Sequence, residues 1–151
     1  MYDAFISFMN EAVNVKKLSL REYSMRQNTV TIPSQFFKSS FFKQLEYASL
    51  GVKAMISDED FLNSSAKYLG FHCDTISDNA INRKIRDWYE TKVGVELSIS
   101  LETIRRLDKD VILQNLPFEY NRSDRCYKIR RRDGKVGTVL IDENSFWLFV
   151  H

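Results

Sequence analysis

Apolar side chains recur at helical spacing through the middle of the chain. Three segments show this spacing most clearly: residues 57–69, 77–92 and 100–114. Each segment opens on a serine, which can cap the free N–H groups of a first helical turn. In the second segment Ile81, Ile85 and Trp88 lie along one edge and Gly94 follows, so this helical pattern is the strongest in the chain.

The pattern before residue 57 also favours helices. Apolar side chains share one helical face in residues 2–16, and phenylalanines recur at helical spacing through residues 37–48. A short β-branched segment, residues 29–32, lies between them and is stopped by a proline. We therefore expect residues 1–56 to form a mostly helical part, which could also pair two copies of the chain as a homodimer.

The apolar pattern changes to simple alternation near the end of the sequence. Residues 126–132 and 136–141 alternate on either side of Asp133-Gly134, a pair typical of two-residue hairpin turns. A second polar turn leads into residues 146–150, which completes a three-stranded antiparallel meander. Because the last strand carries aromatic side chains on both faces, it should be either fully buried or paired with another chain.

Helices followed by a hairpin predict an α+β protein. We expect an N-terminal, mostly helical part over residues 1–56 and a winged-helix-like unit over residues 57–151 that ends in the meander. The two parts are expected either as separate units or as one compact domain.

Composition excludes several classes of protein. The sequence has 44% hydrophobic and 28% charged residues, as ordinary globular proteins do, and no apolar run approaches the ~20 residues of a membrane span. Two cysteines, Cys73 and Cys126, cannot build a disulfide framework, so a reducing cytoplasmic location is expected. The two histidines, His72 and His151, show no metal-ligand spacing, and we expect neither a metal nor another cofactor.

Positive charge is concentrated in one part of the chain. Residues 79–135 contain 14 basic and 9 acidic side chains, whereas residues 1–78 contain 8 and 9. A local basic surplus of this kind is expected of a surface that docks on nucleic acid, although solvated surfaces often carry one too.

One motif lies inside this basic region. The run from Ser100 to Arg106, Ser-Leu-Glu-Thr-Ile-Arg-Arg, resembles the start of the recognition helix in winged-helix repressors of the DeoR type. The resemblance implies that Ser100 caps a helix whose polar side chains contact phosphates and bases: Thr103, Arg105, Arg106 and Lys109. The sequence departs from the family at Leu107-Asp108, where the order of the two residue types is reversed, and in its longer connection at residues 115–125.

The predicted hairpin is a second basic element. Five cations surround its turn: Lys128, Arg130, Arg131, Arg132 and Lys135. As a wing they would grip the DNA backbone or enter the minor groove. The alternative is a hairpin whose charges protect an edge strand from aggregation.

A rival register lies upstream. Residues 66–77 resemble the helix-turn-helix of phage-repressor-type proteins, which would make residues 77–92 the reading helix. That helix would present amide and guanidinium groups to the major groove: Asn79, Asn82, Arg83 and Arg86. Ser65 and Asn79 occupy positions that are apolar in this motif, so the register ranks second.

No catalytic arrangement accompanies these motifs. The carboxylates show no recognised metal spacing, and the sequence contains neither a nucleophile elbow nor a glycine-rich phosphate loop. We therefore predict a non-catalytic DNA-binding transcription regulator, with RNA as a less favoured nucleic acid. The alternative hypothesis is a protein–protein interaction module, such as a phage or plasmid inhibitor, an immunity protein or an assembly adaptor.

Overall fold

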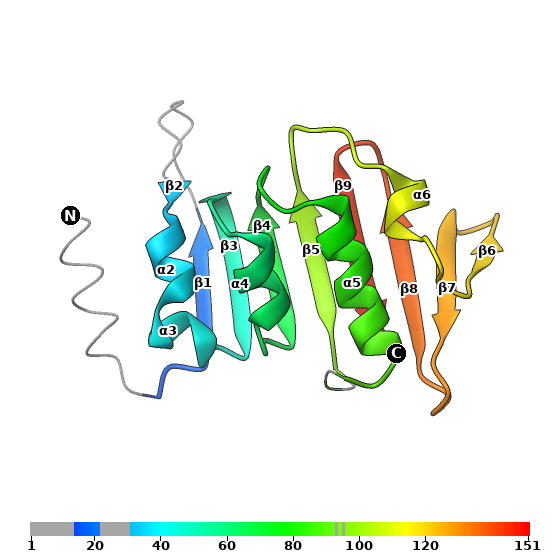
Figure 1. Cartoon of the computed structure of the whole chain (residues 1–151), viewed down its shortest axis with the longest axis horizontal. Coiled ribbons are helices and arrows are strands. Elements are labelled where there is room, and N and C mark those ends of the chain that lie inside the picture. The colour runs from blue at the N-terminus through cyan, green and yellow to red at the C-terminus, as the bar shows by residue number, and fades with distance from the viewer. Residues whose placement is uncertain (1–13, 22–30, 93, 95) are drawn as a thin grey trace.

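A computed structural model describes residues 14–21, 31–92, 94 and 96–151 (Figure 1). In this part of the chain nine strands form one mixed sheet in the order β1-β3-β4-β5-β9-β8-β7-β6, and β2 pairs with β3 outside this order. The strands are β1 (Lys17–Arg21), β2 (Thr31–Ile32), β3 (Tyr47–Ala54), β4 (Tyr68–His72), β5 (Ser98–Glu102), β6 (Glu119–Asn121), β7 (Cys126–Arg130), β8 (Val136–Ile141) and β9 (Ser145–Val150). The helices are α2 (Ser34–Lys38), α3 (Ser40–Lys43), α4 (Asp58–Asn63), α5 (Asp78–Tyr89) and α6 (Lys109–Ile112).

The sheet has a parallel half and an antiparallel half. Strands β1, β3, β4 and β5 run parallel, whereas β9, β8, β7 and β6 pair antiparallel. β9 joins the halves because it pairs antiparallel with β5 on one side and with β8 on the other. The described helices cover one face of this sheet (Figure 1).

The core lies between the helices and that face. In β3 the residues at every second position, from Ala48 to Ala54, are buried, and the positions between them are partly or fully exposed. α5 packs across the centre of the sheet with Ile81, Ile85 and Trp88 completely buried. A methyl group at Gly137 of β8 would lie 2.9 Å from the Trp88 ring, so only glycine allows the helix this close an approach.

The winged-helix prediction is wrong, because a strand replaces its recognition helix. Residues 98–102 form β5, in which Ile99 and Leu101 are 1% exposed and the residues between them face the other side. This alternation and the pairing with β4 and β9 override the helix-like run that begins at Ser100. Of the helix expected at residues 100–114, only α6, Lys109–Ile112, is present.

The other expected helices are also shorter, apart from α5. The helix predicted at 57–69 ends at Asn63, and β4 follows where the rival register required a helix-turn-helix. Residues 1–56 are not mostly helical in their described part, since β1, β2 and β3 lie there with two short helices. The helical face predicted in residues 2–16 falls largely outside the described residues, as does part of the segment 29–32.

The predicted meander exists, but as one end of the large sheet. β7, β8 and β9 pair antiparallel, and Gly134 adopts a φ of 88° in the turn between the first two. Both edges of β9 are paired within the same chain. Phe146 and Leu148 face the core, and Trp147 and Phe149 are half-buried on the opposite face, so the aromatic side chains need no second chain to cover them.

The helices of the described residues are short or polar. Among them, no helix combines the length and the apolar character that crossing a bilayer requires.

Candidate functional site

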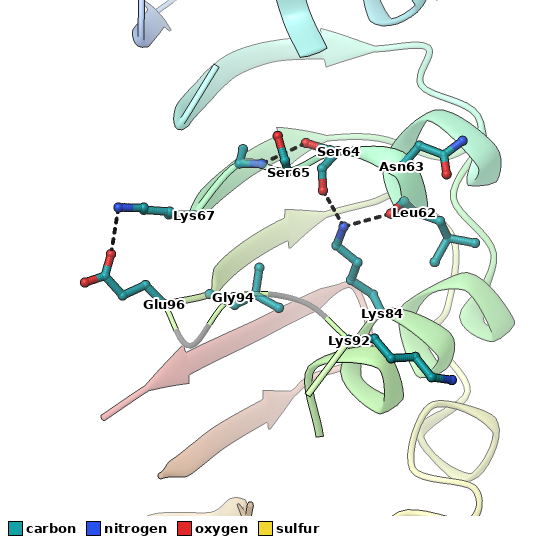
Figure 2. A pocket seen from close by; sticks show the side chains of 11 residues that line it. Leu62, Asn63, Ser64, Ser65, Lys67, Lys84, Lys92, Gly94 and Glu96 are labelled. Atoms are coloured by element: carbon teal, nitrogen blue, oxygen red, sulfur yellow. Dashed lines mark hydrogen bonds and ion pairs between the residues drawn. The ribbon is translucent and has the colours of Figure 1, made fainter. Parts of the chain in front are cut away.

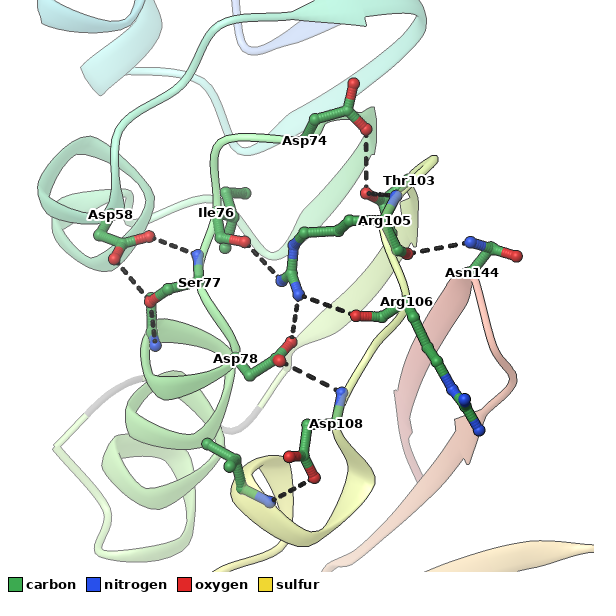
Figure 3. Close-up of polar contacts among 12 residues, drawn as sticks. Asp58, Asp74, Ile76, Ser77, Asp78, Thr103, Arg105, Arg106, Asp108 and Asn144 are labelled. Carbon is green, nitrogen blue, oxygen red and sulfur yellow. Dashed lines mark hydrogen bonds and ion pairs between the residues drawn. The ribbon is translucent and has the colours of Figure 1, made fainter.

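The carboxyl ends of the parallel strands meet along one edge of the sheet. β4 and β5 end beside each other at His72 and Glu102, and Glu102 is opposite Ser145 at the start of β9. The loops that follow β4 and β5 therefore lie next to the β8–β9 turn (Figure 3). In open sheets of parallel strands, this edge is where binding sites usually lie.

The loop after β5, residues 103–108, is held by side chains from three directions; we call it the braced loop. The first support is Asp74, whose Oδ1 accepts hydrogen bonds from the Thr103 hydroxyl and the Ile104 N–H, both at 2.9 Å. The Ile104 N–H holds the pKa of the Asp74 carboxyl below its usual value, and Lys53, 3.0 Å away, acts in the same direction. Asp74 therefore stays ionised and keeps both bonds at neutral pH.

The second support comes from the β8–β9 turn. The Asn144 side-chain amide donates to the carbonyl oxygens of Ile104, at 3.2 Å, and Arg105, at 2.9 Å. In return the Thr103 N–H donates to the Asn144 carbonyl oxygen at 2.9 Å. The Leu107 N–H also donates to the Glu143 carbonyl oxygen at 2.8 Å, so the two segments, about forty residues apart in sequence, are joined by four hydrogen bonds.

The third support is Arg105, which points back into the molecule. Its Nη2 donates to the Ile76 carbonyl oxygen at 2.6 Å, and its Nη1 lies 2.8 Å from Asp78 Oδ1 as an ion pair without hydrogen-bond geometry. The other Asp78 oxygen accepts the Asp108 N–H at 3.2 Å. The guanidinium predicted to contact DNA is therefore occupied by the start of α5 (Figure 3).

The braced loop exposes one large apolar side chain. Ile104 is 84% exposed although the N–H and carbonyl groups of its own backbone are both fixed. Met55, 47% exposed, follows the end of β3. Ile104 also borders a cleft of about 510 Å³ that includes the half-exposed His72–Glu102 contact, 3.2 Å between Nδ1 and Oε2.

The remaining residues of the predicted recognition helix are scattered. Ser100 lies within β5, on the sheet face away from the helices. Arg106 and Lys109 are exposed beside a hollow of about 700 Å³ whose rim also carries acidic side chains: Asp108, Asp110, Asp142 and Glu143. These cations do not form the continuous positive face that a recognition helix needs.

The hairpin cations separate into two kinds. Arg131 is 4% exposed, donates to the Trp88 carbonyl oxygen at 3.2 Å and pairs with Asp133. The hydrogen bond from Arg131 lowers the pKa of Asp133 to about 2. Arg131 therefore fixes the turn beneath α5, and the other four remain exposed: Lys128, Arg130, Arg132 and Lys135.

The residues of the rival register lie on α5, but two of them have structural partners. Asn82 donates from Nδ2 to the carbonyl oxygens of Ile112 and Gln114, which ties α6 to α5. Arg86 pairs with Glu90 at 3.5 Å. Asn79, in the first turn of α5, and Arg83 are both exposed to solvent.

A second hollow, of about 730 Å³, lies at the opposite edge and contains the buried amine of Lys84 (Figure 2). Burial lowers the pKa of Lys84 to about 8, which would suit a nucleophile. However, Nζ donates to the carbonyl oxygens of Phe61, Leu62 and Ser64 at 2.8–3.1 Å. These three bonds use all three protons of the Lys84 ammonium group to close the C-terminus of α4, so the arrangement is structural.

The described residues offer no metal centre. Within them, no group of three or more histidine, cysteine or acidic side chains could hold an ion. Cys73 and Cys126 are free and buried.

Of the residues that brace this loop, the sequence motifs pointed only to Thr103 and Arg105, and to them as DNA contacts. Asp74, Asp78 and Asn144 follow strand or turn segments and carry no motif of their own. The available signal was the alternation at 68–72 and 98–102, since two short strands in parallel would bring their following loops together.

Comparisons with known proteins give one partial match. No family model and no solved structure matches the chain. An uncharacterized F-box protein of Caenorhabditis elegans, T20B12.4, is 37% identical over 71 residues, which are 47% of this chain and 18% of the relative. The chain thus matches less than a fifth of that protein's length.

Proposed function

We propose that the chain is a non-catalytic protein-interaction module that uses the braced loop as its contact point. The observation that carries the proposal is Ile104, 84% exposed on a backbone fixed by Asp74 and Asn144. A stiff β-branched side chain on a fixed loop loses little conformational entropy when a partner covers it. The matching partner surface is an apolar recess, the usual receptor for such an anchor.

Two further findings support this proposal. The carboxylates of Asp74 and Asp78 bind the backbone and side chains of the loop itself, which keeps the loop in one conformation. The partial likeness to an F-box protein is in keeping with a protein-interaction role. We also propose a cytoplasmic location, because free cysteines are typical of a reducing compartment and both described cysteines are free.

DNA binding stays a prediction, and the recognition helix on which it was based is absent from the described residues. β5 takes the place of the recognition helix, and Arg105 is engaged by Ile76 and Asp78. A DNA-binding role would have to use cations that are exposed, such as those of the hairpin.

The proposal can be tested by photo-crosslinking in cells. A benzophenone amino acid is introduced at Ile104, and in a matched control at Arg83, an exposed residue of α5. We expect a discrete cross-linked product from position 104 and none from position 83. A product of twice the chain's mass would identify a second copy as the partner. Equal labelling at both positions, or none at 104, would contradict the proposal.

A further inference from the structure

The far edge of the sheet, formed by β6, carries exposed aromatic side chains. Phe118 is 44% exposed and Tyr120 is 50% exposed, and both rings contact Tyr127 of β7 at centroid distances of 5.3 and 5.0 Å. The order of strands ends at β6, whose outer edge pairs with no described strand. We call this region, with Lys128 and Arg130 of β7, the β6 edge.

The cations of the β6 edge have no acidic partner among the described residues. Lys128 and Arg130 are exposed, and no carboxylate in the described part of the chain lies within ion-pair distance of either. Lysines at the opposite end of the molecule differ: Lys16 pairs with Glu46 at 3.4 Å, and Lys67 with Glu96 at 3.1 Å. The positive charge at the β6 edge is therefore available to an outside group.

The register of β6 and β7 puts the two kinds of side chain on different faces. Tyr120 is opposite Tyr127, which packs against the core on the helix side. Glu119 is opposite Lys128, and alternation places this pair and Arg130 on the face away from the helices. A cleft of about 350 Å³ opens there, lined by Pro117, Phe118, Glu119, Lys128, Arg130 and Val136.

We infer that the β6 edge accepts an extended acidic segment of a partner protein as an additional strand. Side chains of an added strand alternate between the faces, so apolar ones would meet Tyr120 on the helix side. Acidic ones would lie over the cleft on the other face, where Lys128 and Arg130 outweigh the one carboxylate, Glu119. This surface is separate from the braced loop and goes beyond the function proposed for it. Like charges disfavour a second copy of the same edge as the occupant.

Nucleic acid fits this edge less well. Single-stranded binding sites combine cations with aromatic faces on which bases stack. Here Tyr120 and Tyr127 lie on the opposite face from Lys128, and Phe118 meets Tyr127 edge to face, with an interplanar angle of 90°. A polypeptide strand, which presents side chains to both faces, matches the arrangement better.

The test uses the full chain and three labelled probes: a decapeptide alternating valine and glutamate, one alternating valine and lysine, and oligouridine. Binding is followed by fluorescence anisotropy and located by amide chemical shifts. We expect the acidic peptide to bind about tenfold more tightly than the basic one, with shifts centred on residues 118–121.

Variants complete the test. Lys128→Glu combined with Arg130→Glu should weaken binding of the acidic peptide about tenfold. Tyr120→Ser should weaken it about threefold. The matched control, Lys38→Glu with Arg83→Glu, changes the net charge equally at exposed sites outside the β6 edge and should leave binding unchanged. Thermal melts establish that each variant is folded. Equal binding of both peptides, shifts away from residues 118–121, or equal losses in the two double variants would overturn the inference. Preferential binding of oligouridine that depends on Lys128 and Arg130 would replace it with a nucleic-acid site.

Discussion

Side chains that lie close together in the sequence differ sharply in how deeply they are buried. Ile104 and Leu107 lie three residues apart in the braced loop, yet Ile104 is 84% exposed and Leu107 is 6% exposed. In a recognition helix, residues three positions apart lie on the same face, so both side chains would point the same way. The hydrogen bond that Ile104 donates to Asp74 and the one that it accepts from Asn144 hold the loop so that only Leu107 points inward.

This difference in burial predicts that an aspartate changes the free energy of unfolding very differently at the two positions. Ile104→Asp should change the free energy of unfolding by less than about 0.5 kcal/mol, because no buried contact is lost. It should nevertheless abolish partner binding through the braced loop. Leu107→Asp, which buries a charge, should cost about 3 kcal/mol or more. Urea unfolding of both variants measures these values, and a strongly destabilised Ile104→Asp would contradict the exposed position of the side chain.

Lys84 leads to a prediction about pH. Its pKa, about 8 in the folded chain, lies below the ordinary 10.5, so between these values the unfolded chain binds a proton that the folded chain does not. The stability of the wild type should therefore rise with pH from about 8 to 10.5, relative to Lys84→Met. Between pH 7 and pH 9.5 this gain should reach about 2 kcal/mol, because one unit of pKa difference corresponds to about 1.4 kcal/mol. Urea unfolding of both proteins at pH 7 and pH 9.5 measures it, and a constant difference would contradict the shifted pKa.

The braced loop is the element on which the proposed function depends. Asp74→Ala removes the acceptor of the Thr103 hydroxyl and the Ile104 N–H, which should cost about 1–2 kcal/mol. Hydrogen exchange at the Ile104 amide should become about tenfold faster. Asp142→Ala, an exposed acid in the neighbouring turn, is the matched control and should leave this exchange rate unchanged.

The contribution of the Asp74 carboxylate to stability depends on pH in acid, whereas that of Lys84 depends on pH in base. Because the pKa of Asp74 is lowered in the folded chain, its contribution to stability is complete above the ordinary value of 3.8 and is lost as the pH falls through the folded value. The difference between the wild type and Asp74→Ala should therefore narrow in acid. A difference that stays constant below pH 4 would show that Asp74 does not hold the loop as an ion.

Some of the helices and strands could be predicted from the sequence, and others could not. α5 and the strands β7, β8 and β9 lie close to their expected ranges, because each combines a clear apolar period with local capping or turn residues. β4 and β5 have only five residues each and pair with strands far away in sequence. Their alternation was too short to outweigh the serine caps and the helix-like run at 100–106, and the candidate site, which depends on their ends, was missed with them.

At the scale of the whole molecule, one sheet connects the part before residue 57 with the part after it. β3 pairs with β4, and β9 joins the parallel half to the antiparallel half. Leu148→Ala in β9 should therefore destabilise the entire chain by about 2–5 kcal/mol. Tryptophan fluorescence and far-ultraviolet circular dichroism should shift together, since both report one cooperative transition. Two separated transitions would show instead that the halves unfold independently.

The position of β9 also constrains how the protein is made. It is the last of the described strands to leave the ribosome, yet it lies in the middle of the sheet, between β5 and β8. Until residues 145–150 are available, neither β5 nor β8 has the strand that pairs with it in the finished sheet, so both edges stay unpaired. Each edge can pair with the wrong strand, of its own chain or another, so synthesis passes through a stage that favours aggregation. Slower translation before β9 would prolong that stage, and a chaperone that covers strand edges would protect the chain during it.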